Sequence, residues 1–362
     1  MLPTKRLTLT LTLLACCSTA SAEGVRPFCD ALYWRASAAT SAVWSSAIST
    51  SLFSGESPYP VDSSFTAETL QFGWDPGFRV GVELGHQKRS NSWDTKLYWT
   101  NFHTSSRASA YGNEGIMPEL FSSFVGSDII DFNRAAVDWG LTYNTIDLEL
   151  GRKCCVSPTA WLRPSMGIKA GIIQQKARMN LQRDVFGLEL LGAQAVAQNN
   201  SWGIGPSFGI SGGCSFWRCG QTIHSQQDGL ELTEYSGPTL LGPHTSTAPK
   251  RHDLSLIGSL SVDFLFGRWD VNDSYRRTDS LVAPTAYREY TTSMNDTCLG
   301  TPVLHCFLGL QWACQGKVDF TAHAGYELQW WANQQRMTTF QQLPMHGDLT
   351  IEGLTCGASI EF

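Results

Sequence analysis

The stretch that decides the fold is Val318 to Asn333, V-D-F-T-A-H-A-G-Y-E-L-Q-W-W-A-N. Apolar residues occupy all eight even positions of this stretch, and polar residues or glycine occupy most of the odd ones. Alternation with a period of two predicts a β-strand with one apolar and one polar face. Eight apolar positions exceed what a typical soluble strand of about 5 to 6 residues carries. With Trp330 and Trp331 as an aromatic rim, the stretch predicts one strand of a membrane barrel.

The N-terminus has the composition of an export signal. Lys5 and Arg6 precede the apolar run Leu7 to Ala15, and Ala20-Ser21-Ala22 forms a small-residue cleavage site. We therefore expect a signal peptide at 1–22 and a single outer-membrane domain at 23–362. The alternative is a lipoprotein signal, because Leu13 to Cys16 is similar to a lipobox.

Composition and charge narrow the class further. The chain of 362 residues has a formal net charge of −6, which argues against nucleic acid as a partner. Beyond the signal, no apolar run reaches the roughly 18 residues of a membrane helix. An exported chain without such a helix can still cross a membrane as a closed barrel, because closure satisfies every backbone group.

The alternation of the opening stretch recurs along the chain. We expect an all-β, antiparallel transmembrane β-barrel of about 10 strands, with up to 16 possible. The expected strands lie at 29–36, 78–85, 93–100, 135–151, 162–172, 202–211, 254–266, 304–312, 318–333 and 348–362. Between them we expect short turns alternating with long outer loops, and a polar insertion at about 214–252. The loops are expected at 37–65, 102–131, 179–199 and 270–302.

Two local features refine this pattern. Between 135 and 151, the apolar residues change parity, from Val137 to Tyr143 on odd positions to Ile146 to Leu150 on even ones. A β-bulge near Asn144 and Thr145 would account for the change. The last strand ends in Phe362, and such an aromatic end is similar to the signal that the barrel-assembly machinery recognises.

Ten blocks of sequence, in order along the mature chain, carry a family resemblance. They are D30-A-L-Y-W-R, W74-D-P-G-F-R-V-G, S92-W-D-T-K-L-Y-W-T, Y143-N-T-I-D-L-E-L-G-R, L162-R-P-S-M-G-I-K-A, W202-G-I-G-P-S-F-G, F264-L-F-G-R-W-D-V, L308-G-L-Q-W, A324-G-Y-E-L-Q-W-W and D348-L-T-I-E-G-L. Together they resemble the Legionella-type pore-forming outer-membrane proteins, which are similar to the chlamydial major outer-membrane porin. The resemblance implies an outer-membrane porin for passive diffusion of small hydrophilic solutes and ions. The alternative is a structural or adhesive envelope barrel with no open pore.

Charged residues on the predicted inward parity are candidates to line the lumen. They are Arg79, Glu83, Asp94, Lys96, Asp138, Asp147, Glu149, Arg163, Lys169, Asp263, Asp319, His323 and Glu327. Facing acidic and basic walls would orient polar solutes in a water-filled lumen, and an acidic excess would favour cations. The alternative is that these charges pair across a plugged barrel, because ten strands leave a narrow bore.

Nine of the 11 cysteines remain after Cys16 and Cys17 leave with the signal. An exported chain with an odd number of cysteines can form disulfides within itself and with neighbours. Six are expected near periplasmic turns and are disulfide candidates, to the barrel itself or to other cysteine-rich envelope proteins, as in chlamydial-type envelopes. These are Cys29, Cys154, Cys155, Cys214, Cys219 and Cys314.

No enzymatic site is expected. Asp319, His323 and Glu327 share a strand face by parity alone, and no G-x-S-x-G motif accompanies them. Cys214 and Cys219 lack a second ligand pair at zinc spacing, so neither a metal nor a cofactor is expected. The expected partners are outer-membrane lipid and the barrel-assembly machinery.

Overall fold

A computed structural model provides the structure of the chain. It describes residues 24–38, 43–50, 63–85, 93–112, 115–118, 132–185, 188–219, 251–279, 286–316, 318–338 and 344–361. The predicted signal peptide, most of the insertion at 214–252 and Phe362 lie outside these residues.

The described chain is all-β. Its strands are β1 (Val25–Ala38), β2 (Val43–Thr50), β3 (Ser63–Thr69), β4 (Asp75–Leu84), β5 (Trp93–Tyr111), β6 (Gly115–Pro118), β7 (Arg134–Arg152), β8 (Cys154–Cys155), β9 (Ala160–Val185), β10 (Leu188–Cys219), β11 (Arg251–Asp279), β12 (Ala286–Gln315), β13 (Asp319–Thr338) and β14 (Pro344–Glu361). Among the described residues, no helix has the length and apolarity needed to cross a membrane.

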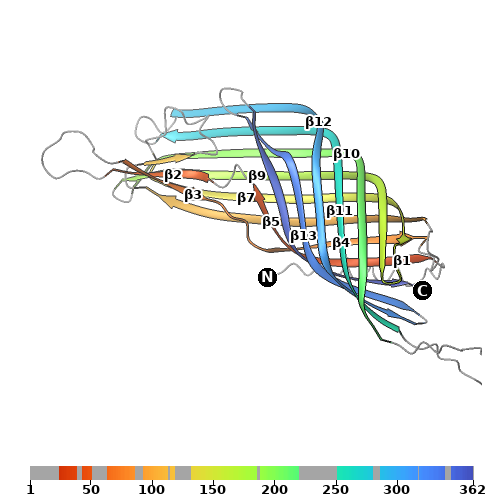
Figure 1. Cartoon of the computed structure of the whole chain (residues 1–362). Coiled ribbons are helices and arrows are strands. Elements are labelled where there is room, and N and C mark those ends of the chain that lie inside the picture. The colour runs from red at the N-terminus through yellow and green to blue at the C-terminus, as the bar shows by residue number, and fades with distance from the viewer. Residues whose placement is uncertain are drawn as a thin grey trace, which may run out of the picture.

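Ten of these strands close into an antiparallel barrel (Figure 1). The order is β10-β11-β12-β13-β14-β1-β4-β5-β7-β9, and pairing of β9 with β10 closes the ring. The predicted barrel of about ten strands is therefore confirmed. Short β8 pairs with β9, and a separate sheet of order β3-β2-β6 is formed by segments between the barrel strands. We call the end where β1 starts and β14 finishes the terminus end, and the opposite end the loop end.

Several strands are much longer than predicted. β9 and β10 have 26 and 32 residues, and their register runs unbroken from Leu191 paired with Arg183 to Cys214 paired with Ala160. The predicted loop at 179–199 is therefore wrong, and so is most of the one at 270–302, where β11 and β12 continue to pair. In β10, the buried positions of the extension hold small residues such as Ala193 and Ala195, which give a weak apolar signal.

The predicted β-bulge at Asn144 and Thr145 is also wrong. β7 pairs with both β5 and β9 in continuous register through these residues. Odd positions of β7 face the interior along its whole length, so Val137 to Tyr143 are buried inside the barrel, whereas Ile146 to Leu150 face outward. The environment on each side of the barrel wall changes along the strand. At the loop end, the interior is apolar and the outer surface is polar. At the terminus end, the interior is polar and the outer surface is apolar.

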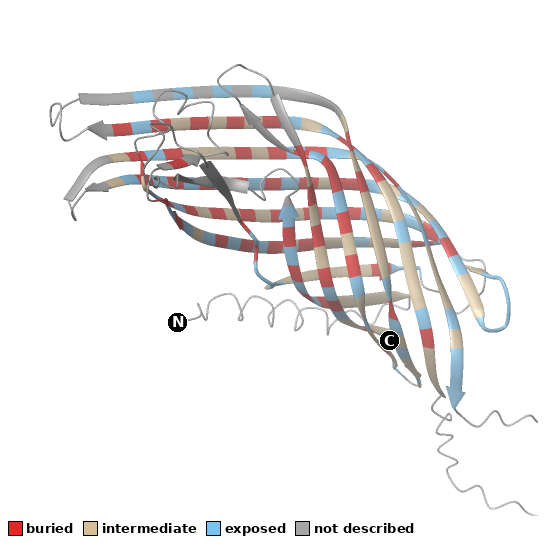
Figure 2. Ribbon diagram, turned by 60° about the vertical axis from the view of Figure 1, so that its left-hand side comes forward, coloured by how far each residue is buried: buried red, intermediate tan, exposed pale blue. Residues whose placement is uncertain are grey.

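The reversed half has the surface of a membrane span. On β9, outward side chains from Leu162 to Ile172 are apolar and exposed, and the next outward positions are Gln174 and Lys176. This belt covers 11 residues, which fits the roughly 9 to 11 that a tilted strand needs to cross a bilayer. Figure 2 shows buried and exposed residues alternating along the strands.

A real bulge lies in β13. Its register with β14 shifts between Trp331 and Gln335, and Asn333 has a φ of 53°. The Asn333 N–H donates to Asp348 Oδ1 at 2.9 Å. Only Trp330 therefore lies on the outer surface as predicted. Trp331, which we placed in the same aromatic rim, points inward and is 2% exposed.

Candidate functional site

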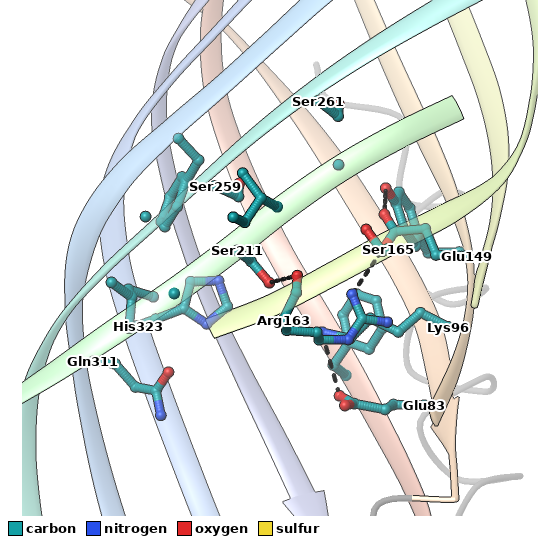
Figure 3. Close-up of a pocket in the computed structure, with 18 of the residues that line it drawn as sticks. Glu83, Lys96, Glu149, Arg163, Ser165, Ser211, Ser259, Ser261, Gln311 and His323 are labelled. Carbon is teal, nitrogen blue, oxygen red and sulfur yellow. Dashed lines mark hydrogen bonds and ion pairs between the residues drawn. The ribbon is translucent and has the colours of Figure 1, made fainter. Parts of the chain in front are cut away.

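The candidate site is the barrel interior in the half surrounded by the apolar belt. It contains a cavity of about 290 Å³ that reaches the terminus end of the barrel. Eight of the predicted lumen residues line it, and Figure 3 shows five of them in place. The eight are Arg79, Glu83, Asp94, Lys96, Glu149, Arg163, His323 and Glu327.

The first ion cluster surrounds Arg79. Its Nη2 lies 2.5 Å from Glu327 Oε1, and its Nη1 lies 3.4 Å from Asp30 Oδ2. Arg79 stands on β4 and Glu327 on β13, with β1 and β14 between them. Glu327 is 1% exposed and also accepts a hydrogen bond from Thr355 Oγ1 at 2.9 Å. This cluster therefore joins four neighbouring strands inside the barrel.

Two histidines extend the first cluster. His305 Nε2 lies 2.8 Å from Glu327 Oε1, and His323 Nε2 lies 3.5 Å from Asp30 Oδ1. The predicted face shared by His323 and Glu327 thus lies within a set of ion pairs. Among the described residues, no group of three or more His, Cys, Asp or Glu side chains is arranged to hold a metal ion.

The second cluster surrounds Lys169. Its Nζ lies 2.7 Å from Asp263 Oδ2 on β11 and 3.2 Å from Asp147 Oδ1 on β7. All three side chains are at most 5% exposed. Burying a charge is costly unless it is paired, and here one cation serves two carboxylates from different walls.

The third cluster lies closer to the terminus end. Arg163 binds Asp94 through two nitrogens, and its Nη1 lies 3.0 Å from Glu149 Oε2. Tyr98 OH donates to Glu149 Oε1 at 2.7 Å. The three clusters together pair most of the lumen charges, as the plugged-barrel alternative predicts.

Toward the loop end, an apolar layer follows the ion clusters. Trp331 packs edge-on against Tyr143 with ring centroids 5.6 Å apart, and both side chains are buried. Gly171 on the facing wall makes room for the indole, since a Cβ there would lie 3.2 Å from Trp331 Cη2. Within the β13 bulge, the Gln334 side-chain amide donates to Ser201 Oγ on β10, and the Gln334 backbone carbonyl accepts from Trp269 Nε1 on β11. The β13 bulge thus contacts β10 and β11 inside the barrel and closes the interior.

Two predicted lumen residues lie elsewhere. Asp138 is on the outer face of β7, where its side chain is 48% exposed and pairs with Arg107 at 3.1 Å. The mistake arose because we assumed that the apolar residues Val137 to Tyr143 face outward, which assigned Asp138 to the inward parity. Asp319 lies at the terminus-end rim, where its Oδ1 accepts the Gly316 N–H at 3.0 Å.

Several interior residues were not predicted. Arg26 and Asp30 share the inward parity of Leu32 and Trp34. Asp30 lies within the predicted first strand but was not assigned to the lumen, and Arg26 lies three residues before the predicted start of that strand at Cys29. Lys153 also lines the cavity, and it comes from a turn, where parity gives no signal.

The cysteine candidates are placed as follows. Cys154 and Cys155 form β8 at the terminus end, and Cys214 pairs in register with Ala160 beside them. Cys219 and Cys314 both pair with His252. Cys29 lies on β1 opposite Ala358. All six thiols are free in this structure, as are the two other cysteines whose side chains are described.

A closed barrel with an apolar outer belt and a charged interior defines a transmembrane β-barrel of the outer-membrane class. The chain belongs to the family of the Legionella pneumophila major outer membrane protein precursor, whose model matches residues 27–221, more than half of its length. The protein is therefore an outer-membrane barrel protein, as the sequence predicted.

The comparisons with curated proteins and with solved structures give weaker results. No curated protein matches the chain. The transport unit of the autotransporter AIDA-I from Escherichia coli has a TM-score of 0.28 at 5% identity, covering 95% of this chain and 91% of that one. A Pseudomonas aeruginosa FadL homologue has a TM-score of 0.26 at 8% identity, with 93% and 89% covered. The P. putida toluene transporter TodX has a TM-score of 0.24 at 6% identity, with 94% and 91% covered. Such low scores carry no functional argument.

Proposed function

We propose that the protein is a narrow channel for ions and small hydrophilic solutes, and that the conformation described is its closed state. The observation that carries the proposal is the charged interior within the lipid-facing belt, with its cavity of about 290 Å³. A purely structural barrel has no need of a dozen ionisable side chains there, because apolar residues of similar volume are often as stabilising as buried ion pairs. The ten-strand bore limits passage to small solutes.

Passage requires that two obstacles move. The ion clusters of Arg79 and Lys169 occupy the interior, and Trp331 with Gln334 closes the layer above them. Ion pairs can exchange partners once water and a solute enter the lumen, whereas the Trp331 indole must leave its slot. We therefore assign the gate to the β13 bulge.

The second candidate is a structural or adhesive envelope barrel with no open pore. The observation that favours it is the same closure, since the bulge joins β13 to β10 and β11 by hydrogen bonds inside the barrel. In this case the fold serves to hold the loop-end strands outside the membrane.

Single-channel conductance in planar bilayers distinguishes the two candidates. Trp331→Ala removes the indole from the lumen, and Trp330→Ala is the matched control, because its ring lies on the outer surface. A channel gated by Trp331 predicts larger or more frequent openings for Trp331→Ala and wild-type behaviour for Trp330→Ala. If all three folded proteins are silent, the channel is refuted and the structural barrel remains.

The remaining expectations belong to the same proposal. We propose no catalytic role and no cofactor. Assembly by the barrel-assembly machinery through Phe362 and disulfides to neighbouring envelope proteins are further proposals, supported by the C-terminal strand pattern and by the exposed Cys155, Cys214 and Cys219.

A further inference from the structure

Two cations at the terminus end of the cavity differ from the other lumen cations. Arg26 on β1 donates through Nε to Ser359 Oγ at 2.8 Å and through Nη2 to Thr321 Oγ1 at 2.6 Å. Both acceptors are neutral hydroxyls. Lys153, in the turn between β7 and β8, lies with its Nζ 4.7 Å from the centre of the Trp161 ring. All three side chains, Arg26, Lys153 and Trp161, line the same cavity.

Arg26 and Lys153 differ from the cations of the ion clusters in their charge balance. Arg79, Arg163 and Lys169 each contact two carboxylates. Among the described residues, no carboxylate lies within ion-pair distance of Arg26 or Lys153. A partly buried cation that makes no direct ion pair is costly, so the barrel holds two cations toward one volume at a cost in stability.

The two cations are close enough to affect each other. Burial, followed by repulsion from the Arg26 guanidinium, holds the pKa of Lys153 below its ordinary range. Glu83 opposes this shift, but its carboxylate lies 3.5 Å from Lys96 Nζ and is shared with that cation. An anion bound between Arg26 and Lys153 would relieve the repulsion.

We propose that Arg26, Lys153 and Trp161 form a binding site for a small oxyanion, a phosphate or carboxylate group, at the terminus end of the lumen. The guanidinium offers planar donors, and the ammonium offers a point charge. The Trp161 face can contact the apolar part of a larger solute. Because these residues line the interior, the ligand is a dissolved solute rather than a lipid headgroup. The site goes beyond the proposed channel, since it holds whether or not a solute crosses the barrel.

Isothermal titration calorimetry of the refolded full-length mature protein in detergent tests the site. Pyrophosphate is the probe, at low ionic strength, and succinate is a parallel arm that separates phosphate from carboxylate recognition. We expect saturable binding of one pyrophosphate per chain. Arg26→Gln and Lys153→Gln should each weaken it at least tenfold, because each removes a charge-assisted contact.

The matched control is Arg107→Gln, which removes an exposed cation outside the lumen and should leave the affinity unchanged. Because Lys153 lies in a turn, the Lys153→Gln variant remains informative if the Arg26→Gln variant does not fold. Absence of saturable binding of both probes to the wild type overturns the site, as does binding that survives both substitutions. Because calorimetry does not require conduction, a silent channel that still binds pyrophosphate refutes only the proposed function.

Discussion

Removing the charge of Lys169 should destabilise the barrel more than breaking any ion pair on its surface. Lys169→Met leaves Asp147 and Asp263 facing each other from two walls, and each of their side chains is at most 5% exposed. Breaking a buried pair by removing one partner typically costs about 3 to 5 kcal/mol, because the remaining charge is uncompensated. We therefore expect the unfolding equilibrium constant to rise about 100-fold or more.

The control is an ion pair of similar length whose side chains are exposed to water. Arg107 and Asp138 lie 3.1 Å apart, with side chains 81% and 48% exposed, so Arg107→Met should cost about 0 to 1 kcal/mol. The triple variant Lys169→Met, Asp147→Asn, Asp263→Asn removes the stranded carboxylates and should recover most of the loss. Urea titration of the protein folded in lipid vesicles, followed by tryptophan fluorescence, gives all the values. Equal losses of unfolding free energy for Lys169→Met and Arg107→Met would refute the view that the Lys169 cluster is shielded from water.

Two other predictions concern the β13 bulge and the cysteines. Asn333 has a φ of 53°, which asparagine tolerates and β-branched residues do not, so Asn333→Val should lower stability by about 1 to 2 kcal/mol in urea titration, whereas Asn333→Gly should change it little. Equal effects of the two would show that the backbone conformation is not limiting. Non-reducing gels of isolated envelopes should reveal reducible oligomers that are lost when Cys155, Cys214 and Cys219 are all changed to Ser; monomer alone in the wild type contradicts intermolecular disulfides.

Much of the barrel could be predicted because lipid imposes a strong pattern. Where one face meets hydrocarbon, alternation from Leu162 to Ile172 or from Val318 to Trp330 is unmistakable, and it gives strand number, order and the inward parity of Arg79, Lys169 and Glu327. The charges that meet across the lumen could not be paired from sequence. Arg79 on β4 reaches Glu327 on β13 because of the register between the strands and the closure of the barrel.

The misplaced Asp138 and the false bulge in β7 share one physical cause. We assumed that apolar side chains face outward along a whole strand, which holds only within the bilayer. Above it, Val137 and Trp139 are buried inside and Asp138 faces water, so the same parity means the opposite face. A backbone irregularity such as that at Asn333 leaves no comparable mark, since the residues around it continue to look like a strand.

The length of β10 determines how far the barrel wall extends beyond the membrane. Its 32 residues correspond to a contour of about 105 Å at roughly 3.3 Å per residue, whereas the hydrocarbon core is about 30 Å thick. Even with a steep tilt, the strand extends beyond the bilayer by tens of ångströms, and its pairing with β9 is continuous from Leu191 to Cys214. At the loop end, the barrel wall therefore continues past the hydrocarbon core as paired strands rather than as free loops.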